Sequence, residues 1–313
     1  MKTTPLQEET VACNLCGADD YTIIYKKIDT PLEVPLHEKF SAAKGILSTD
    51  QIVKCRHCGL VYTNPRIKQE IMLDSCSQGD DEVYVSQEEG RKKTFQEGLH
   101  WIKSKTHPTR KEKILDVGCA AGFFLSVAQE QGFEPYGVEL NAWLAEKGRT
   151  KFNLKNIMTG TLEEARWKND FFDYVTVWDV LEHVPNPLQT LQEINRITQK
   201  NGYIIISYPD YSSIFAKIFG RRWWFLLSHH IYYFTPKTMK SMLEKAGYRI
   251  IDDKMHWQKL KVVYMLDMFV KLNKNKIVQF PFKLTSSFLK ALKLENLSIR
   301  YYASQRDVIA QKK

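Results

Sequence analysis

Residues 114–124 read Ile-Leu-Asp-Val-Gly-Cys-Ala-Ala-Gly-Phe-Phe, an apolar run that leads into a loop with two glycines. A strand that is covered on both faces reads as a nearly continuous apolar run. Gly118 and Gly122 allow the backbone of the loop to approach a ligand where a side chain would block it. The stretch therefore predicts a buried parallel strand, a tight ligand-binding turn and the start of a helix.

An acid follows this turn at an informative distance. A second apolar run, 136–138, ends at Glu139, which lies 21 residues after Gly118. An acid about 20 residues beyond a glycine turn is placed to accept hydrogen bonds from ribose hydroxyls. Ala120 and Phe123 occupy the positions where the dinucleotide-binding pattern requires its second and third glycines. We therefore expect a nucleoside-bearing cofactor without a pyrophosphate, and a negative φ at Ala120, the region in which alanine is tolerated.

Three later segments continue the alternation of strand and helix. Residues 172–178 have the β-branched alternation of a strand, and 203–207 form another apolar strand before Pro209. Between them, 187–198 has the apolar periodicity of a helix, which a basic last turn and a glycine at 200–202 would close. This order predicts an α/β fold with a doubly wound, mostly parallel sheet, whose ligands bind beyond the carboxyl ends of the strands. The residues expected around that crevice are Asp116, Glu139, 179–183 and 208–210.

Residues 113–253 resemble a class I S-adenosylmethionine-dependent methyltransferase, of the bacterial group that includes quinone O-methyltransferases and sugar methyltransferases. The loop 116–122, Glu139 and the segment 179–187, Asp-Val-Leu-Glu-His-Val-Pro-Asn-Pro, carry the likeness. It implies a Rossmann-like core and an acceptor that is a small molecule, a sugar or a lipid-linked intermediate. The methyl group would go to a hydroxyl or, alternatively, to a carbon or nitrogen of a nucleotide-linked sugar. The cofactor contacts that the resemblance implies are Asp116, Gly118, Cys119, Ala120, Gly122, Glu139, Leu140, Thr161, Leu162 and Asp179.

Methyl transfer from a sulfonium is an in-line displacement, so the protein must align the acceptor and remove its proton. His183 is the first candidate for the base, because imidazole titrates near neutral pH; it could instead orient its loop, with Glu182 as the base. In the quinone enzymes that this segment resembles, a divalent cation can be held at the positions of Asp179, Glu182 and His183. The family also shows a histidine four residues before a Phe-Thr pair, which is His230 here, whereas His229 is a weaker candidate.

Two Cys-x-x-Cys pairs mark an N-terminal module. Cys13 and Cys16 are separated by 38 residues from Cys55 and Cys58, and a glycine follows each pair. Four thiolates at such spacing suit a tetrahedral structural zinc ion. The expected domains are a zinc-ribbon module (1–68), a helical linker or lid (69–112), the methyltransferase core (113–253) and a basic amphipathic extension that ends in a strand (254–313).

The net charge of +9 is concentrated near the C-terminus. Residues 254–313 hold thirteen Lys/Arg and three Asp/Glu, a net charge of +10, so the other residues together carry −1. The segment 215–227 pairs two arginines with two tryptophans, and 261–272 is largely apolar. One interpretation is that these segments wall an apolar pocket. The other is that they rest on an anionic membrane, whose interface favours indole rings and lysines.

The sequence also bears on location and on macromolecular partners. The first ten residues lack the apolar core of a signal peptide, and no apolar run reaches the ~18 residues of a membrane span. We therefore expect a cytoplasmic protein, peripheral to the inner face of the membrane if it contacts lipid. A zinc ribbon with a basic tail is also compatible with RNA binding or modification. Nucleic acid is the less favoured partner, because the cysteine segment has no dense basic patch and no aromatic stacking motif.

Overall fold

The computed structural model describes residues 7–28, 46–78, 81–109, 111–263, 266–267, 270, 276–292, 294 and 297–313. The chain forms two compact units, 1–254 with 306–313, and 255–305. The segments expected as zinc module, linker and core therefore belong to one unit, to which the end of the chain returns.

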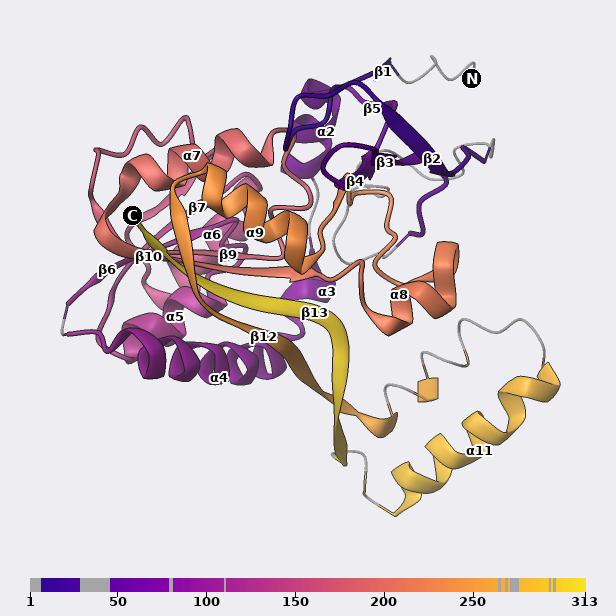
Figure 1. Cartoon of the computed structure of the whole chain (residues 1–313). Helices are drawn as coiled ribbons and strands as arrows, with labels where there is room; N and C mark the ends of the chain where they lie inside the picture. The colour runs from indigo at the N-terminus through magenta and orange to yellow at the C-terminus, as the bar shows by residue number, and fades with distance from the viewer. Residues whose placement is uncertain are drawn as a thin grey trace. The chain divides into compact units, whose positions relative to one another are not determined.

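The first unit is built on a seven-stranded sheet (Figure 1). The pairs β10–β9, β9–β6, β6–β7 and β7–β8 are parallel. The order reverses between β6 and β9, which confirms the expected doubly wound α/β sheet. Sheets of this kind bind ligands beyond the carboxyl ends of the strands at such a reversal. In spatial order the strands are β12 (Tyr248–Lys261), β13 (Ser298–Lys312), β10 (Thr198–Pro209), β9 (Phe172–Trp178), β6 (Lys113–Val117), β7 (Glu134–Glu139) and β8 (Ile157–Thr159).

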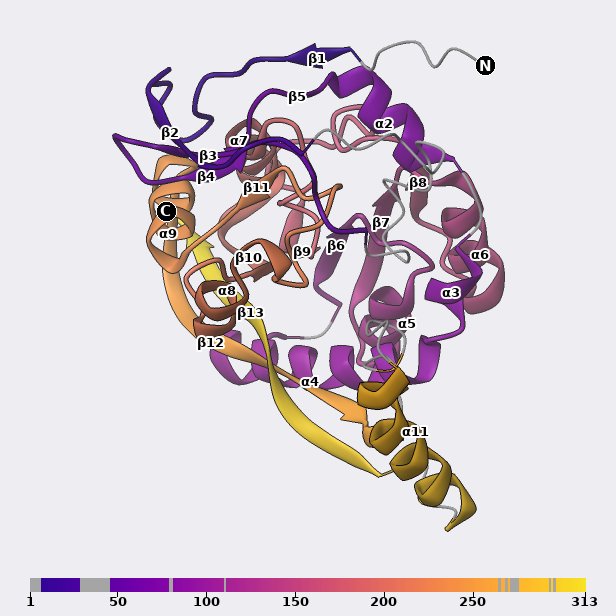
Figure 2. The ribbon, with the colours of Figure 1, turned by 90° about the vertical axis from the view of Figure 1, so that its right-hand side faces the viewer.

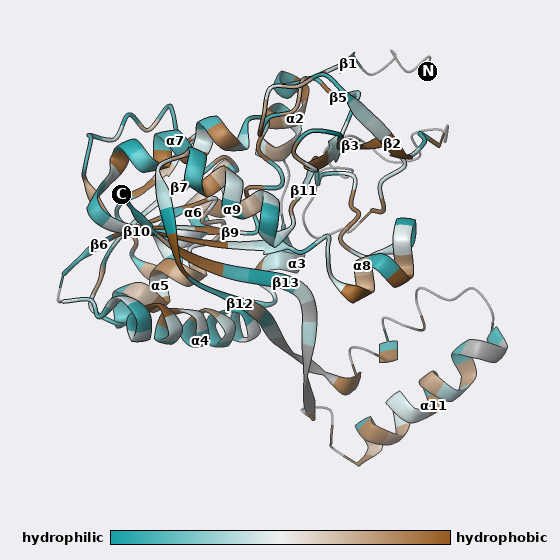
Figure 3. Cartoon of the chain, in the orientation of Figure 1, coloured by the Kyte–Doolittle hydropathy of each residue, from teal (hydrophilic) through white to brown (hydrophobic). Residues whose placement is uncertain are grey.

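Helices cover both faces of this sheet. α4 (Glu88–Thr106) and α5 (Phe123–Glu130) lie on one face, and α7 (Pro187–Ile197) and α9 (Pro236–Lys245) on the other, while α6 (Ala142–Phe152) packs on β7 and β8 (Figure 1). Figure 3 shows hydrophobic residues on the central strands and hydrophilic ones on the outer sides of α7 and α9. Because the strands are buried between helical layers, their sequences are apolar runs, as at Leu115, Val175 and Ile205.

The boundary between α7 and β10 differs from the sequence prediction. Thr198 is extended (φ −76°, ψ 136°) and pairs with Phe172, so α7 ends at Ile197. Residues 200–202 therefore lie within β10, where the register shifts between Thr198 and Tyr203. The expected helix-closing turn was wrong because pairing with β9 overrides the local capping signals.

A smaller antiparallel sheet joins the N-terminal segment to a part of the chain far along the sequence. Its order is β11 (Tyr232–Tyr233), β4 (Val61–Thr63), β3 (Ile52–Cys55) and β2 (Tyr21–Tyr25). Tyr232 pairs with Tyr62, and Figure 2 shows β11 beside β4. A separate ribbon pairs β1 (Glu8–Glu9) with β5 (Arg66–Ile67). The N-terminal segment is therefore continuous with the rest of the first unit.

Short helices complete this unit. α2 (Gln69–Ser77) and α3 (Glu82–Val85) precede α4, and α8 (Ile214–Phe219) and the 3-10 turn η1 (Gly220–Arg222) precede β11. Trp223 is fully buried and packs against Tyr211 and Phe225, whereas Trp224 is 39% exposed. Only one of the paired tryptophans is therefore available at the surface.

The second unit contains helix α11 (Lys276–Ala291) and the parts of β12 and β13 that fall within 255–305. Phe280, Leu284 and Phe288 follow one another at intervals of four, so they share one face of α11, and Leu292 lies in the turn after the helix. Each of these four side chains is more than half exposed. Part of the expected apolar segment 261–272 lies outside the described residues. A search of the residues with described structure finds no helix that could cross a membrane.

Candidate active site

The cofactor loop, residues 118–122 between β6 and α5, is held by Glu139 at the carboxyl end of β7. Glu139 Oε2 accepts a hydrogen bond from the Ala120 amide and Oε1 accepts one from the Asn141 amide, both at 2.8 Å. Ala120 has a φ of 46°, so the expectation of a negative φ was wrong. The left-handed conformation costs an alanine about 1 kcal/mol, which its bond to Glu139 offsets. A carboxylate has about four lone pairs, so Glu139 can still accept hydrogen bonds from a ligand.

The amide groups of residues 118, 119, 120 and 122 in this loop donate within the protein. Gly118 and Cys119 both donate to the Val138 carbonyl, at 2.8 and 3.2 Å, and Gly122 donates to the Cys119 carbonyl at 2.9 Å. A pyrophosphate site needs such amides free. The cofactor loop therefore suits a ligand without pyrophosphate, as its glycine spacing predicts.

The two glycines of this loop are required by their protein neighbours. Gly118 and Gly122 have φ values of 71° and 73°, which side chains rarely adopt. A Cβ would lie 2.6 Å from Val180 at the first position and 2.6 Å from Leu154 at the second. The loop thus depends on glycine whether or not a ligand is bound.

Two further acids lie near the carboxyl ends of β6 and β9. Asp116 is buried and accepts a hydrogen bond from the Thr176 hydroxyl at 2.7 Å; burial raises its pKa to about 8. Asp179 is exposed, has a φ of 52° and accepts a hydrogen bond from the Ser207 hydroxyl at 3.2 Å. With Glu139 they place three carboxyl groups at this edge, and a cofactor that carries a sulfonium and an ammonium group would favour their charged forms.

The remaining residues predicted to contact the cofactor divide into two groups. The Cys119 thiol is buried, and a Cβ on Gly137 would lie 2.7 Å from its Sγ. Leu162 is also buried in the main hydrophobic core. Leu140 and Thr161 are half-buried and lie just after β7 and β8. The side chains of Cys119 and Leu162 thus pack the interior, whereas Leu140 and Thr161 are accessible to a ligand.

Helix α3 brings an aromatic ring to the cofactor loop, a position that the sequence analysis missed. Tyr84 stacks on Phe123 with ring centroids 5.4 Å apart, and the Arg91 guanidinium lies 4.1 Å from the Tyr84 centroid. Burial, and then the negative charges of Asp116 and Glu139, raise the pKa of Tyr84, against the effect of Arg91. The linker therefore places a tyrosine beside the acids of the site. The sequence signal that could have identified Tyr84 is that it is an aromatic residue in a polar stretch.

Three histidines from two segments meet after β9, and we call them the imidazole trio. The His183 ring centroid lies 4.9 Å from that of His229 and 4.7 Å from that of His230, and the latter two are 4.8 Å apart. One ring nitrogen of each lies within 4.8 Å of the others. The structure therefore brings together His183 and His230, which the sequence favoured, and adds His229, which it ranked lower.

Hydrogen bonds orient two of these rings. His183 Nδ1 lies 2.9 Å from the His229 carbonyl oxygen, and His230 Nδ1 lies 2.8 Å from that of Phe225. A carbonyl only accepts, so Nδ1 carries the proton and Nε2 of the neutral ring keeps its lone pair. Burial lowers the pKa of both imidazoles, and for His230 the other two rings lower it further. Both rings are therefore neutral at physiological pH.

Glu182 directly precedes His183 in the sequence. Its side chain is buried, with 1% of its surface exposed. Burial, and then the charge of Asp179, raise its pKa well above the ordinary range. Neither carboxyl oxygen finds a hydrogen-bond partner in the part of the chain that the structure describes. A carboxyl that is held neutral cannot accept a proton, which favours histidine over Glu182 as the base.

The Glu182 backbone ties the two histidine segments together. Its carbonyl accepts hydrogen bonds from the amides of Ile231 and Tyr232, at 2.9 and 3.2 Å.

The ring nitrogen of His183 is grouped with ring nitrogens of the other two histidines. The resemblance implied that Asp179, Glu182 and His183 could hold a cation. Among the described residues, the ligand atoms of these three do not form a group close enough to share one ion.

The cysteine cluster, formed by Cys13, Cys16, Cys55 and Cys58, converges as its spacing predicts. Sγ atoms lie 3.4 Å apart in the pair Cys13–Cys58 and 3.5 Å apart in the pair Cys16–Cys55, and all four lie within 4.8 Å of one another. Such a set of four thiols could hold one tetrahedral metal ion with no position left open.

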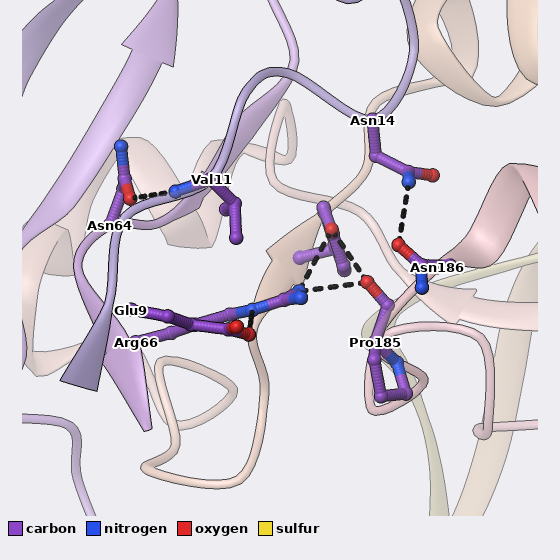
Figure 4. Close-up of polar contacts among 8 residues, drawn as sticks. Glu9, Val11, Asn14, Asn64, Arg66, Pro185 and Asn186 are labelled. Atoms are coloured by element: carbon purple, nitrogen blue, oxygen red, sulfur yellow. Dashed lines mark hydrogen bonds and ion pairs between the residues drawn. The ribbon is translucent and has the colours of Figure 1, made fainter. Parts of the chain in front are cut away.

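Figure 4 shows how the cysteine segment is fastened to the segment 179–187. Arg66, with 6% of its surface exposed, donates from Nη1 to the Pro185 carbonyl at 2.7 Å. Asn14, which lies between the first two cysteines, donates to the Asn186 side chain at 3.3 Å. The N-terminal segment therefore contacts the segment that carries His183.

Comparison with known proteins agrees with this geometry. The ubiquinone biosynthesis O-methyltransferase of Histophilus somni is 27% identical over 118 residues, which are 35% of this chain and 50% of that protein. The protein of the same name from Leptothrix cholodnii is 26% identical over 117 residues, 35% of this chain and 49% of that protein. The match thus spans about half the length of these relatives.

Two further comparisons concern the fold and the family. A methyltransferase of Haloferax volcanii, solved in complex with the Trm112 methyltransferase activator, superposes with a TM-score of 0.51 at 11% identity, over 74% of this chain and 94% of that one. This likeness shows the fold alone. A family model described as a methyltransferase domain matches residues 90–253, more than half of the chain. The chain therefore belongs to the methyltransferase domain family, the S-adenosylmethionine-dependent enzymes that share this α/β fold.

Proposed function

We propose that the protein transfers the methyl group of S-adenosylmethionine to a hydroxyl of a small-molecule, sugar or lipid-linked acceptor. The observation that carries the proposal is the segment after β9. Asp179 lies at the acidic edge next to the cofactor loop, and four residues later His183 belongs to the imidazole trio. Cofactor and acceptor would therefore meet at this segment, with acids on one side and neutral imidazoles on the other.

Different residues would bind the cofactor and remove the proton of the acceptor. When bound, the cofactor supplies an electrophilic methyl group on a positively charged sulfur. Glu139 has lone pairs left to hold the ribose hydroxyls, and Asp116 and Asp179 would face the amino-acid end. On the acceptor side, an Nε2 lone pair of His183 or His230 can take the hydroxyl proton while the oxygen bonds to the methyl carbon.

Support for a hydroxyl acceptor comes from the relatives, which are named O-methyltransferases. A hydroxyl also needs a proton acceptor, and the neutral rings of His183 and His230 can serve as one. Methylation of a carbon or nitrogen on a nucleotide-linked sugar is the alternative, and it would use the same cofactor loop.

The test uses methyl-labelled S-adenosylmethionine and an extract of the source cells, with Glu139→Ala as the inactive control. We expect label that depends on the wild-type protein in the organic-soluble or small aqueous fraction, on an oxygen atom of the product. Label on carbon or nitrogen would support the sugar alternative. Label in RNA, or no transfer above the Glu139→Ala control in any fraction, would contradict the proposal.

We also propose that the cysteine cluster holds a structural Zn²⁺ ion and that the protein acts in the cytoplasm. The thiol convergence supports the first point, and the presence of six unpaired cysteines suits a reducing compartment. Elemental analysis should find zinc bound to sulfur, and Cys55→Ser should release it and lower the melting temperature. Protein that melts at the same temperature after chelation would contradict the structural role.

Helix α11 supports peripheral contact with a membrane, and through it a lipid-linked acceptor. Its exposed apolar face, formed by Phe280, Leu284 and Phe288, lies on a helix that also carries Lys283 and Lys290. An amphipathic helix of this kind binds an anionic lipid surface by burying its apolar side chains while lysines contact head groups. We propose the inner face of the membrane as that surface.

A further inference from the structure

We propose that the imidazole trio is a second metal site, in which His183, His229 and His230 each give one ring nitrogen to a divalent transition metal such as Zn²⁺. The site is separate from the cysteine cluster and offers a different set of ligand atoms.

The geometry of the rings supports coordination. The three centroid distances are nearly equal, from 4.7 to 4.9 Å, and His230 stands across the other two rings at 73° and 85°. The His183 and His229 rings are themselves stacked at 23°, so His230 crosses a stacked pair. Zinc–nitrogen bonds of about 2.0 Å in a tetrahedron need nitrogens about 3.3 Å apart. Small side-chain rotations reach that spacing from nitrogens that already lie within 4.8 Å of one another.

The surroundings of two rings match those of metal ligands. A ligating histidine usually donates its second ring N–H to a carbonyl or carboxylate, which fixes the tautomer. His183 and His230 have this arrangement, with carbonyl oxygens 2.9 and 2.8 Å from Nδ1. The Glu182 carbonyl, which accepts the Ile231 and Tyr232 amides, holds the two segments in register. The frame for three ligands is thus set by backbone hydrogen bonds.

The donor set selects the class of ion. Three imidazoles suit zinc, cobalt, nickel or copper, whereas calcium and magnesium require oxygen ligands. His229 and His230 are only 4% and 5% exposed, so an ion held by the trio would be shielded from solvent on their side. Three protein ligands leave a fourth position open, as in catalytic zinc sites and unlike the cysteine cluster.

An acceptor hydroxyl in that open position would lose its proton more easily, because a bound cation lowers the pKa of a coordinated oxygen. The proton would then leave to solvent and not to an imidazole. This use of the ion rests on the proposed function, whereas the existence of the metal site does not.

The test counts and identifies bound metal in the full-length protein after equilibration with Zn²⁺ and removal of the excess. We expect two zinc ions per chain. X-ray absorption at the zinc edge should show one ion with sulfur at about 2.3 Å and one with nitrogen at about 2.0 Å. His229→Gln and His230→Gln should keep the sulfur-bound ion and weaken the nitrogen-bound ion at least about tenfold. His100→Gln, on the exposed side of α4, is the matched control and should keep both.

Retention of the sulfur-bound ion in each variant shows that it is folded. One zinc ion per chain with sulfur ligands only would overturn the proposal, and so would a nitrogen-bound ion that survives both His229→Gln and His230→Gln. A methyl-transfer assay on the same zinc-loaded protein separates the two hypotheses. Two bound ions without transfer would contradict the proposed function and leave the metal site standing.

Discussion

The guanidinium of Arg66 donates to the Pro185 carbonyl at 2.7 Å, although 119 positions separate the two residues. The same Nη1 donates to the Tyr232 hydroxyl at 3.1 Å, and Nε donates to Glu9 at 2.9 Å. The Tyr232 hydroxyl also donates to the Pro185 carbonyl, at 3.0 Å. One buried cation therefore joins the N-terminal segment to both chain segments that carry the imidazole trio. We therefore expect Arg66 to act as a positioning residue for the site.

Arg66→Ala should lower the free energy of unfolding by about 2 kcal/mol, because it leaves a buried carbonyl and a hydroxyl without their charged donor. It should also lower kcat while the affinity for S-adenosylhomocysteine stays unchanged, since the Arg66 hydrogen bonds go to Glu9, Pro185 and Tyr232, which lie outside the cofactor loop. Arg66→Lys keeps the charge but not the planar fork, and should recover only part of both losses. Urea unfolding and calorimetry measure these effects.

The control is Arg56→Ala, because Arg56 is mostly exposed and pairs with the exposed Asp20 at 3.3 Å. Its effect on stability should stay below about 0.5 kcal/mol. Equal losses of stability in the two variants would show that Arg66 contributes no more to the free energy of unfolding than an exposed arginine does.

Glu139→Ala should weaken S-adenosylhomocysteine binding by about 1–3 kcal/mol, because both the ribose acceptor and the two bonds that shape the loop are lost. Glu134→Ala, at the exposed start of the same strand, should bind as the wild type does. Titration calorimetry gives both values. An unchanged affinity in Glu139→Ala would mean that the cofactor lies elsewhere.

Stability should fall as the pH rises from about 4 toward 8, because burial raises the pKa of Asp116 from 3.8 to about 8. Across that window the folded protein keeps a proton that the unfolded chain has lost. Asp116 therefore stabilises the fold fully below about pH 4 and loses that contribution as the pH approaches 8, by up to about 1.4 kcal/mol per pH unit.

Asp116→Asn cannot ionise and should remove this component from the pH profile. The nearby Glu139, whose pKa burial also raises, stays in both proteins and cancels in the comparison. Urea unfolding of the two proteins across the window gives the difference. Parallel profiles would show that Asp116 is ionised in the folded protein.

Leu284→Gln combined with Phe288→Gln should reduce binding to vesicles that contain phosphatidylglycerol by at least about tenfold, since each buried apolar side chain contributes on the order of 1–2 kcal/mol. Wild-type binding should also fall with added salt, because lysines contribute. Ser287→Gln, an exposed polar position on the same helix, is the control. Wild-type protein that does not sediment with these vesicles would exclude the membrane role.

The fold was predictable wherever a local pattern has one physical explanation. Apolar runs between helical segments gave the parallel sheet, and the paired cysteines gave the cluster. The positive φ of Ala120 was not predictable, because it depends on a hydrogen bond to Glu139 that exists only in the folded loop. The early start of β10 likewise depends on pairing between Thr198 and Phe172.

The candidate site was predictable only one residue at a time. His183 and His230 stand in recognisable motifs, but the contact of His183 with His229 joins residues that are 46 positions apart in the sequence. Arg66 and Tyr84 carried no motif, and their place follows from the packing of β5 and α3. Local pattern identifies side chains with suitable chemistry, whereas tertiary contacts decide which of them share a site.

The four-stranded sheet can be completed only late in the synthesis of the chain. β4 emerges early in synthesis, but its neighbour β11 pairs Tyr232 with Tyr62 and so arrives 170 residues later. Until then one edge of β4 is open, and an open edge is a template for pairing with another chain. The nascent protein must therefore keep its N-terminal hairpin from aggregating through the synthesis of nearly the whole core. Binding of a metal ion to the cysteine cluster during synthesis would hold the N-terminal hairpin in a rigid form until β11 is made.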